Sequence, residues 1–302
     1  MATQPFATQA TPDTMRVLYR AAIDCQHSID SDQVTLHRNP NLPGNALSQL
    51  ADRLDAEEAR LRSKLIGGPI SGGSSVGDHV SNLRLRAKPE FITFTGADSD
   101  TDINEMLALS DQYPIEWGIL FSPKLQGTGR YPALSTIKRI ASTPGFRLAA
   151  HICGGDARAV IAGGAFPHDG LVASYFLRAQ INTADPEVDP SRIKSWADRL
   201  GVRAILQCRE SFPGDQNVDY LYDTSGGRGD SPLNWPDFRA SKSPCGYAGG
   251  LNPDNVAAQI KRFAPESGRY WIDMESGVRD DLDRFSLEKC RAVCENVYGE
   301  RS

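Results

Sequence analysis

The residues best suited to acid/base chemistry stand at the ends of short apolar runs. His151 and Cys153 end the run from Arg147 to Cys153, and an imidazole that titrates near neutrality suits a general base. Period-two alternation points both side chains to the same face of a strand. Three roles stay open for this pair: proton transfer, substrate binding or packing, and metal ligation with Cys208 or Glu275 as a further ligand.

Asp223 ends another apolar run and precedes a glycine-rich loop that contains Gly227. If burial raises its pKa from about 3.9, this carboxyl group can protonate a leaving oxygen or a ring oxygen. Alternatively, Asp223 only caps the loop. The sequence therefore predicts a general acid here and leaves the structural role open.

Two glycine-containing segments carry the clearest ligand-binding signal. In the first, adjacent glycines let the backbone approach a ligand, and an asparagine is expected to cap a helix that begins at Pro253. Free N–H groups at a helix start bind anions, and barrels often hold phosphate between their last two loops. The second segment runs from Glu275 to Val278. The predicted phosphate-binding residues are Gly249, Gly250, Asn252, Ser276 and Gly277, unless they are only turn and cap residues.

Other polar residues fall at strand ends. Gln180 and Asn182 alternate at the end of one run, where their amides could bind sugar hydroxyls or satisfy loop backbone. The Glu275 carboxylate could act as a base or repel a phosphate, and these outcomes oppose each other. We predict no resident cofactor and no metal for this site.

The elements that must position these residues alternate between strand-like and helix-like segments from Phe91 onward. Eight such βα units in about 210 residues predict a (β/α)8 barrel, in which residues at the carboxyl ends of the strands form the active site. A doubly wound sheet is the competitor, but Thr95-Gly96-Ala97-Asp98 is not its dinucleotide-binding turn. The predicted strands are Phe91 to Thr95, Glu116 to Phe121, Arg147 to Cys153, Tyr175 to Asn182, Val202 to Cys208, Val218 to Asp223, Cys245 to Ala248 and Tyr270 to Met274. The clearest predicted helices are Asp102 to Asp111, Ala133 to Ala141, Pro190 to Leu200, Pro253 to Phe263 and Leu287 to Val297.

Residues 1–88 differ from the predicted barrel at 89–302. They open with a Thr/Gln/Pro-rich tail, contain helical patterns and end in a linker that includes Gly67 to Ser75. A leucine stripe from Leu47 to Leu65 predicts an amphipathic helix. This extension is expected to pack on the barrel, to pair with a second copy in a homo-oligomer, or to recognise another partner.

Composition limits the partners. The 302-residue chain is 40% hydrophobic and carries a net charge of −5, which argues against a nucleic-acid binder. No apolar run approaches the roughly 20 residues that span a bilayer, and residues 1–14 lack the apolar region of a signal peptide. Six cysteines without a CxxC pattern are read as reduced thiols. We therefore expect a cytoplasmic protein with a small-molecule substrate and no membrane partner.

Taken in order, these motifs resemble the phosphoribosylanthranilate isomerase family. Asp223 with its loop, the stretch from Ala248 to Val256 and the stretch from Asp273 to Val278 are similar to the family's sixth, seventh and eighth strand motifs. The stretch Gly118-Ile119-Leu120-Phe121-Ser122-Pro123 resembles its second-strand signature, and Arg130 is the counterpart of its substrate-binding arginine. The resemblance covers roughly residues 91–298 and implies a barrel that opens a phosphorylated ribose ring with Asp223 as the acid.

The first strand departs from this pattern. The family ends that strand in Lys-x-Cys-Gly, with the cysteine moving the C2′ proton, whereas this chain has Thr93-Phe94-Thr95-Gly96. Thr95 thus occupies the position of the base, and losing a general base typically costs about 10²- to 10⁴-fold in rate. We therefore predict an acid/base isomerisation of a phosphorylated sugar or related small molecule, other than the standard Amadori reaction, with His151 as the replacement base. A non-catalytic barrel that binds a phosphorylated ligand, or acts as a scaffold, is the alternative.

Overall fold

The computed structural model of the chain describes residues 87–183, 185–225, 231–238, 241, 243–265 and 268–301. The predicted tail, helical extension and linker lie outside these ranges, apart from residues 87 and 88. Gly227 in the predicted glycine-rich loop also lies outside them.

Eight parallel strands form a closed barrel. Each strand pairs with the next along the chain, and the last pairs with the first. The closed parallel sheet confirms the predicted (β/α)8 architecture. The strands are β1 (Ile92–Thr95), β2 (Ile115–Phe121), β3 (Leu148–Ile152), β4 (Arg178–Ile181), β5 (Arg203–Cys208), β6 (Asp219–Asp223), β7 (Cys245–Ala248) and β8 (Tyr270–Met274).

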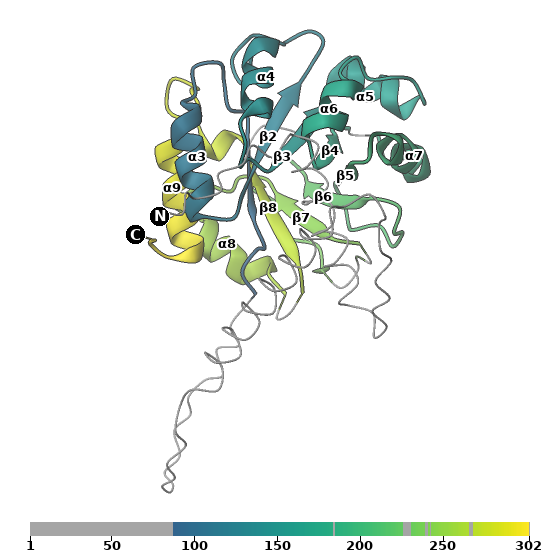
Figure 1. The fold of residues 1–302 in the computed structure, drawn as a ribbon. Helices are drawn as coiled ribbons and strands as arrows, with labels where there is room; N and C mark the ends of the chain where they lie inside the picture. The colour runs from purple at the N-terminus through teal and green to yellow at the C-terminus, as the bar shows by residue number, and fades with distance from the viewer. Residues whose placement is uncertain are drawn as a thin grey trace, which may run out of the picture. The chain divides into compact units, whose positions relative to one another are not determined.

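Helices surround the strands, as Figure 1 shows. Their N-termini follow the carboxyl ends of the strands, where polar side chains cap several of them. Asp102 precedes α3 and accepts a hydrogen bond from Asn104 N, and Ser286 does the same for Lys289 N ahead of α9. The helices are α3 (Ile103–Gln112), α4 (Leu134–Ser142), α5 (Gly154–Ile161), α6 (Asp169–Tyr175), α7 (Pro190–Leu200), α8 (Val256–Phe263) and α9 (Leu287–Tyr298), with the short 3₁₀ helix η2 at Ser276–Val278.

Seven of the predicted strands agree with the structure to within one residue at each end, but the fourth was predicted too long. Tyr175 is the last residue of α6, and β4 begins only at Arg178. Apolar residues on both sides of the boundary explain the error, because Val172 in α6 and Phe176 just after it are both buried. Helices α5 and α6 were not among the clearest helical patterns, since each spans only 8 or 7 residues.

The start of α8 also differs from the prediction. The helix begins at Val256, three residues after the predicted start at Pro253. The Asn252 side chain accepts hydrogen bonds from Asp254 N and Asn255 N, at 3.0 and 3.1 Å, and so closes a separate turn ahead of the helix. Asn252 therefore caps a turn and not the first turn of α8.

The barrel interior is filled in layers, because alternate residues of each strand point inward. Charged residues occupy the end where the strands begin, apolar residues follow, and polar residues occupy the end where the strands finish. The pattern runs Arg203, Ile205, Gln207 along β5 and Asp219, Leu221, Asp223 along β6. The apolar layer belongs to a separate buried cluster formed by Phe91, Ile205, Leu221, Ala248 and Trp271.

Glu116 is the centre of the charged layer. Its side chain is fully buried, accepts a hydrogen bond from Thr93 Oγ1 at 2.9 Å, and lies 3.1 Å from Arg178 Nε and 3.2 Å from Arg147 Nε. Burial disfavours the charge, but the two guanidinium groups and the Thr93 hydroxyl outweigh it and keep the pKa of Glu116 below its ordinary value. This end of the barrel is therefore held by ion pairs.

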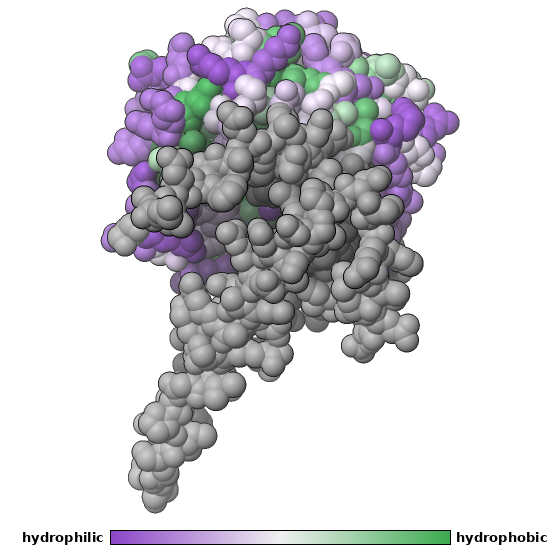
Figure 2. Space-filling view, viewed as in Figure 1, coloured by the Kyte–Doolittle hydropathy of each residue, from purple (hydrophilic) through white to green (hydrophobic). Residues whose placement is uncertain are grey.

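The described surface in Figure 2 mixes hydrophilic residues with small, separate hydrophobic patches. Among the described residues, four large apolar side chains are exposed: Leu125, Tyr175, Leu233 and Leu282. None of the helices in the described ranges has the length and apolar character needed to cross a membrane.

The substitution Glu116→Gln is expected to lower the free energy of unfolding at pH 7 by about 3 kcal/mol, because it removes the carboxylate that pairs with the buried Arg178 and the partly exposed Arg147. A carboxyl group with a depressed pKa stabilises the fold above the pKa of the unfolded chain and loses that contribution in acid. The difference between the two proteins should therefore shrink below about pH 4. Urea unfolding at several pH values tests this, with the exposed Glu300→Gln as the control. Equal stability of the two proteins at pH 7 would show that the ion pairs contribute nothing.

Candidate active site

A cavity of about 270 Å³ opens at the carboxyl ends of the strands. All eight βα units contribute residues to its wall, which is the place where barrels carry their active sites. Most of the sequence-predicted site residues line it, namely Thr95, His151, Cys153, Gln180, Asn182, Asp223, Gly249, Gly250, Glu275, Ser276 and Gly277. Arg130 and Asn252 do not belong to the described wall of the cavity.

Thr95, His151 and Asp273 meet on the floor of the cavity. Thr95 Oγ1 donates a hydrogen bond of 2.9 Å to Asp273 Oδ1, and His151 Nε2 lies 3.8 Å from Asp273 Oδ2. Gly118 makes this meeting sterically feasible, since a Cβ there would overlap Thr95 Oγ1 and lie 3.0 Å from His151 Nε2. Three groups able to move a proton are thus held together beside a glycine of β2.

Burial changes the acidity of this group. Burial, opposed by the Thr95 hydrogen bond and reinforced by nearby carboxylates, raises the pKa of Asp273 well above its ordinary value. Burial also lowers the pKa of His151 to about 4, because Arg178 adds to the desolvation cost and Glu116 only partly offsets it. The imidazole is therefore neutral near pH 7, which is the form that accepts a proton.

Gln180 orients the His151 ring. The two residues are register partners on β3 and β4, and Gln180 Nε2 lies 3.4 Å from His151 Nδ1. A base role for His151 requires the ring proton on Nδ1 and a free lone pair on Nε2, which faces Asp273, whereas an amide that donates to Nδ1 would place the proton on Nε2. Among the described residues, His151 Nε2 and Gln180 Oε1 are buried polar atoms without a hydrogen-bond partner. A ligand or water in the cavity would satisfy them.

Cys153 is a thiol and not a thiolate. Burial and the nearby Glu275 raise its pKa to about 12, although Asn182 Nδ2 donates a 3.2 Å hydrogen bond to Sγ. A thiol of that acidity is a poor nucleophile and a poor metal ligand at neutral pH. Within the described ranges, no group of three or more His, Cys, Asp or Glu side chains is placed to hold a metal ion.

Asp223 faces the same cavity from β6. Its carboxyl group is 7% exposed and accepts hydrogen bonds from Ser225 N at 2.9 Å, Ser225 Oγ at 2.7 Å and Gln207 Nε2 at 3.3 Å. These contacts include the loop-capping interaction that the sequence left open for this residue. They also fix the orientation of the carboxyl group, which a proton donor requires.

The glycines after β7 and β8 bring two loops together. Gly249 and Gly250 have φ angles of 110° and 63°, in the region that favours glycine. A Cβ on Gly277 would overlap the carbonyl oxygen of Leu251, so the β8 loop packs directly on the β7 loop. Both loops thereby reach the wall of the cavity, to which Gly249, Gly250 and Gly277 belong.

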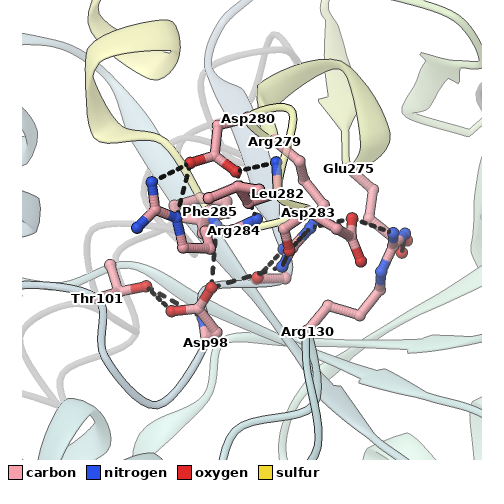
Figure 3. A network of polar contacts seen from close by, with 11 residues as sticks. Asp98, Thr101, Arg130, Glu275, Arg279, Asp280, Leu282, Asp283, Arg284 and Phe285 are labelled. Atoms are coloured by element: carbon pink, nitrogen blue, oxygen red, sulfur yellow. Dashed lines mark hydrogen bonds and ion pairs between the residues drawn. The ribbon is translucent and has the colours of Figure 1, made fainter.

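Arg130 reaches the rim of the site and not its wall. Its guanidinium pairs with Glu275 Oε1 at 2.6 Å and with Asp283 Oδ1 at 2.9 Å, as Figure 3 shows. Burial raises the pKa of Glu275, and the hydrogen bond from Arg130 only partly opposes that rise. The sequence placed Arg130 and Glu275 in the site separately but did not predict that they bind each other.

Sequence reasoning missed six polar residues of the cavity wall: Tyr131, Thr183, Gln207, Arg209, Ser225 and Asp273. A signal for Asp273 was present, because strand alternation places it on the same side as Glu275, two residues later. Gln207 shares a face with Ile205 and could have been found in the same way. Tyr131 and Arg209 come from loops, whose paths the strand pattern does not specify.

The fold and the cavity define this chain as a (β/α)8 barrel with a cavity lined by titratable side chains at the carboxyl ends of its strands. The family model of N-(5'-phosphoribosyl)anthranilate isomerase matches residues 196–296. The N-(5'-phosphoribosyl)anthranilate isomerase of Synechococcus sp. (strain JA-2-3B'a(2-13)) is 29% identical over 138 residues, which cover 39% of this chain and 56% of that relative. These matches relate the chain to the phosphoribosylanthranilate isomerase family.

Solved structures from two organisms are similar to this chain. TrpF from Jonesia denitrificans is 18% identical, with a TM-score of 0.49, over 69% of this chain and 97% of that one. Phosphoribosyl anthranilate isomerase from Thermotoga maritima is 15% identical, with a TM-score of 0.48, over 70% of this chain and all of that one.

The His151 ring is expected to titrate with a pKa of about 4 in the folded protein. Because the unfolded chain binds this proton more readily, the stabilising effect of a neutral His151 is present above pH 6.5 and is lost as the pH falls toward 4. NMR detection of the ring nitrogens between pH 8 and the onset of acid unfolding measures the charge state directly. A titration midpoint between pH 6 and 7 would contradict the assigned burial.

The substitution Gly118→Ala is expected to lower the free energy of unfolding by about 2 kcal/mol, because the added methyl group overpacks the space between Thr95 and His151. Gly170→Ala is the matched control, since its Cβ would meet no atom within 4 Å and Gly170 lies in α6. Urea unfolding compares the two variants. If both variants were as stable as the parent, the close approach of Thr95, His151 and Gly118 would be wrong.

Proposed function

We propose that this barrel binds a phosphorylated sugar or a related phosphorylated small molecule and isomerises it by proton transfer, in a reaction other than the standard Amadori rearrangement. One observation carries the proposal: Asp223, His151 and Asp273, from three different strands, line a single cavity whose wall also includes the packed loops after β7 and β8. The Synechococcus relative supports the substrate class, since its name specifies a phosphoribosyl compound.

The loops after β7 and β8 are proposed to bind the phosphate. Gly249, Gly250, Ser276 and Gly277 all belong to the cavity wall, and small residues there let backbone N–H groups approach an anion. Arg209, which follows β5, is the arginine in the described wall, and its exposed side chain can add a positive charge to the cavity. This arrangement supports phosphate binding at the β7 and β8 side.

Asp223 is proposed to act as the acid on the sugar oxygen, and His151 as the base on the carbon-bound proton. Neutral His151 is the form that accepts a proton, and Asp273 at 3.8 Å is near enough to share it. Thr95 takes the position of the family's catalytic cysteine but donates its hydroxyl hydrogen to Asp273. The hydroxyl group is thus a positioning contact for Asp273, and proton transfer falls to His151 and Asp273.

The proposed chemistry is tested by proton exchange, which does not require the natural substrate to be known. Ribose 5-phosphate incubated with the protein in D₂O is expected to gain deuterium at C2, detected by NMR. Asp223→Asn and His151→Gln should each slow the exchange by about 10²- to 10⁴-fold. Calorimetric titration with ribose 5-phosphate should still show binding, because neither residue belongs to the proposed phosphate site.

The exchange experiment also separates the enzyme from a binding protein. Binding of ribose 5-phosphate without any deuterium incorporation would favour the non-catalytic barrel. Absence of binding to ribose 5-phosphate and to inorganic phosphate would overturn the phosphate site itself. Glu300→Gln, on the segment after α9, should leave both binding and exchange unchanged.

A further inference from the structure

The His151 ring has one side chain within hydrogen-bond distance, that of Gln180. Gln180 Nε2 lies 3.4 Å from His151 Nδ1, and both side chains are 2% exposed. The other ring nitrogen, Nε2, has no hydrogen-bond partner among the described residues, since Asp273 Oδ2 at 3.8 Å is too far away. The atom that Gln180 presents to Nδ1 therefore determines which ring nitrogen carries the proton.

Gln180 also belongs to a chain of hydrogen bonds that leads to a thiol. Its Nε2 donates to Asn182 Oδ1 at 2.7 Å, and Asn182 Nδ2 donates to Cys153 Sγ at 3.2 Å. All three side chains line the cavity. Each amide has a donor nitrogen and an acceptor oxygen, so the direction of one hydrogen bond fixes the direction of the next. The His151 tautomer is thus connected to the whole chain of amides.

In the direction seen in the structure, the amides donate toward the ring and toward the thiol. Donation to His151 Nδ1 places the ring proton on Nε2, which then donates and cannot accept. Gln180 Oε1 is left as a buried acceptor without a partner among the described residues. This first direction requires a donor from whatever molecule enters the cavity.

The same chain can also run in the reverse direction, if both amides rotate by half a turn. Asn182 Oδ1 then accepts from the Cys153 thiol, which keeps its hydrogen because burial raises its pKa to about 12. Asn182 Nδ2 donates to Gln180 Oε1, and this oxygen also accepts from His151 Nδ1. Gln180 Nε2 is now the group that needs a partner, and His151 Nε2 has a free lone pair.

The group that a ligand places against Gln180 selects between the two directions. A carbonyl oxygen only accepts, so it pairs with the amide nitrogen of the second direction and leaves the amide oxygen of the first unpaired. A hydroxyl group donates and accepts, so it satisfies either direction. Without an acceptor the first direction is expected, because proteins leave buried N–H groups unpaired more rarely than buried carbonyl oxygens.

We propose that Gln180 is a positioning residue that couples ligand binding to the tautomer of His151. A carbonyl group bound against Gln180 moves the ring proton from Nε2 to Nδ1 and so frees the Nε2 lone pair. The inference deepens the proposed function and rests on it, because it takes His151 as the base. The base thus forms when a ligand with a carbonyl group is in the cavity.

Nitrogen-15 NMR of the full chain, labelled at histidine, shows which ring nitrogen carries hydrogen. The signals of His151 are those that disappear in His151→Gln. Ribulose 5-phosphate, an open-chain ketone, is expected to move the hydrogen from Nε2 to Nδ1 at pH 7. Ribitol 5-phosphate has the same chain and phosphate but a hydroxyl group in place of the ketone, so it should leave the tautomer unchanged. Calorimetric titration establishes that each compound is bound.

Variants along the chain of amides separate coupling from simple binding. Gln180→Met fills a similar volume without hydrogen-bonding groups and should abolish the tautomer shift. Cys153→Ser keeps a donor for Asn182 and should retain the shift, whereas Cys153→Ala should reduce the ligand-induced population of Nδ1–H about tenfold. Gln112→Met is the matched control, because Gln112 bonds Arg291 between α3 and α9 and should leave the shift unchanged. Thermal unfolding confirms that each variant is folded.

The outcomes distinguish this inference from the function on which it rests. Binding of ribulose 5-phosphate without a change of tautomer, or an unchanged shift in Gln180→Met, would overturn the coupling while leaving the phosphate site intact. Failure of both sugar phosphates and of inorganic phosphate to bind would overturn the proposed function, and the inference with it. If Gln180→Met does not fold, the Cys153 variants decide, since equal shifts in the serine and alanine variants contradict the chain of amides.

Discussion

The contact between Thr95 and Asp273 joins the two strands that close the barrel, and the rest of the site is arranged around it. These residues are 178 positions apart in sequence and meet only because β8 pairs with β1. His151 completes the group from β3, across a glycine of β2 that leaves room for both side chains. The site is therefore a property of the closed barrel, and no isolated βα unit contains it.

Burial sets the chemistry of this contact in a consistent direction. A desolvated carboxyl group keeps its proton more firmly, and a desolvated imidazole gives its proton up more readily. Asp273 and His151 show these two effects side by side, because burial raises the pKa of Asp273 well above its ordinary value and lowers that of His151 to about 4. At the opposite end of the barrel, Arg178 and Arg147 outweigh the effect of burial and keep the pKa of Glu116 below its ordinary value. Burial is thus met by ion pairs at one end of the barrel and by shifted pKa values at the other.

The strands could be predicted from the sequence because a closed parallel barrel buries short, nearly continuous apolar runs. The fourth strand was predicted too long, since a buried helix end and a buried strand start have the same apolar composition. Strand alternation also placed His151, Gln180 and Asp223 at one rim. It could not show that Arg130 reaches Glu275, because that contact spans 145 residues and depends on loop paths. Nor could it show that Asp273 accepts the Thr95 hydrogen bond, which requires the register of the closing strands.

Two contacts within the chain shape the carboxyl end of the barrel. At the first strand, the Thr95 hydroxyl donates a hydrogen bond to the Asp273 carboxyl group, whose pKa is raised by burial. After the eighth strand, the Glu275 carboxylate forms an ion pair with the Arg130 guanidinium of the same chain. Both contacts are made within the chain at the carboxyl ends of the strands, where the cavity lies, and neither could be deduced from one βα unit alone.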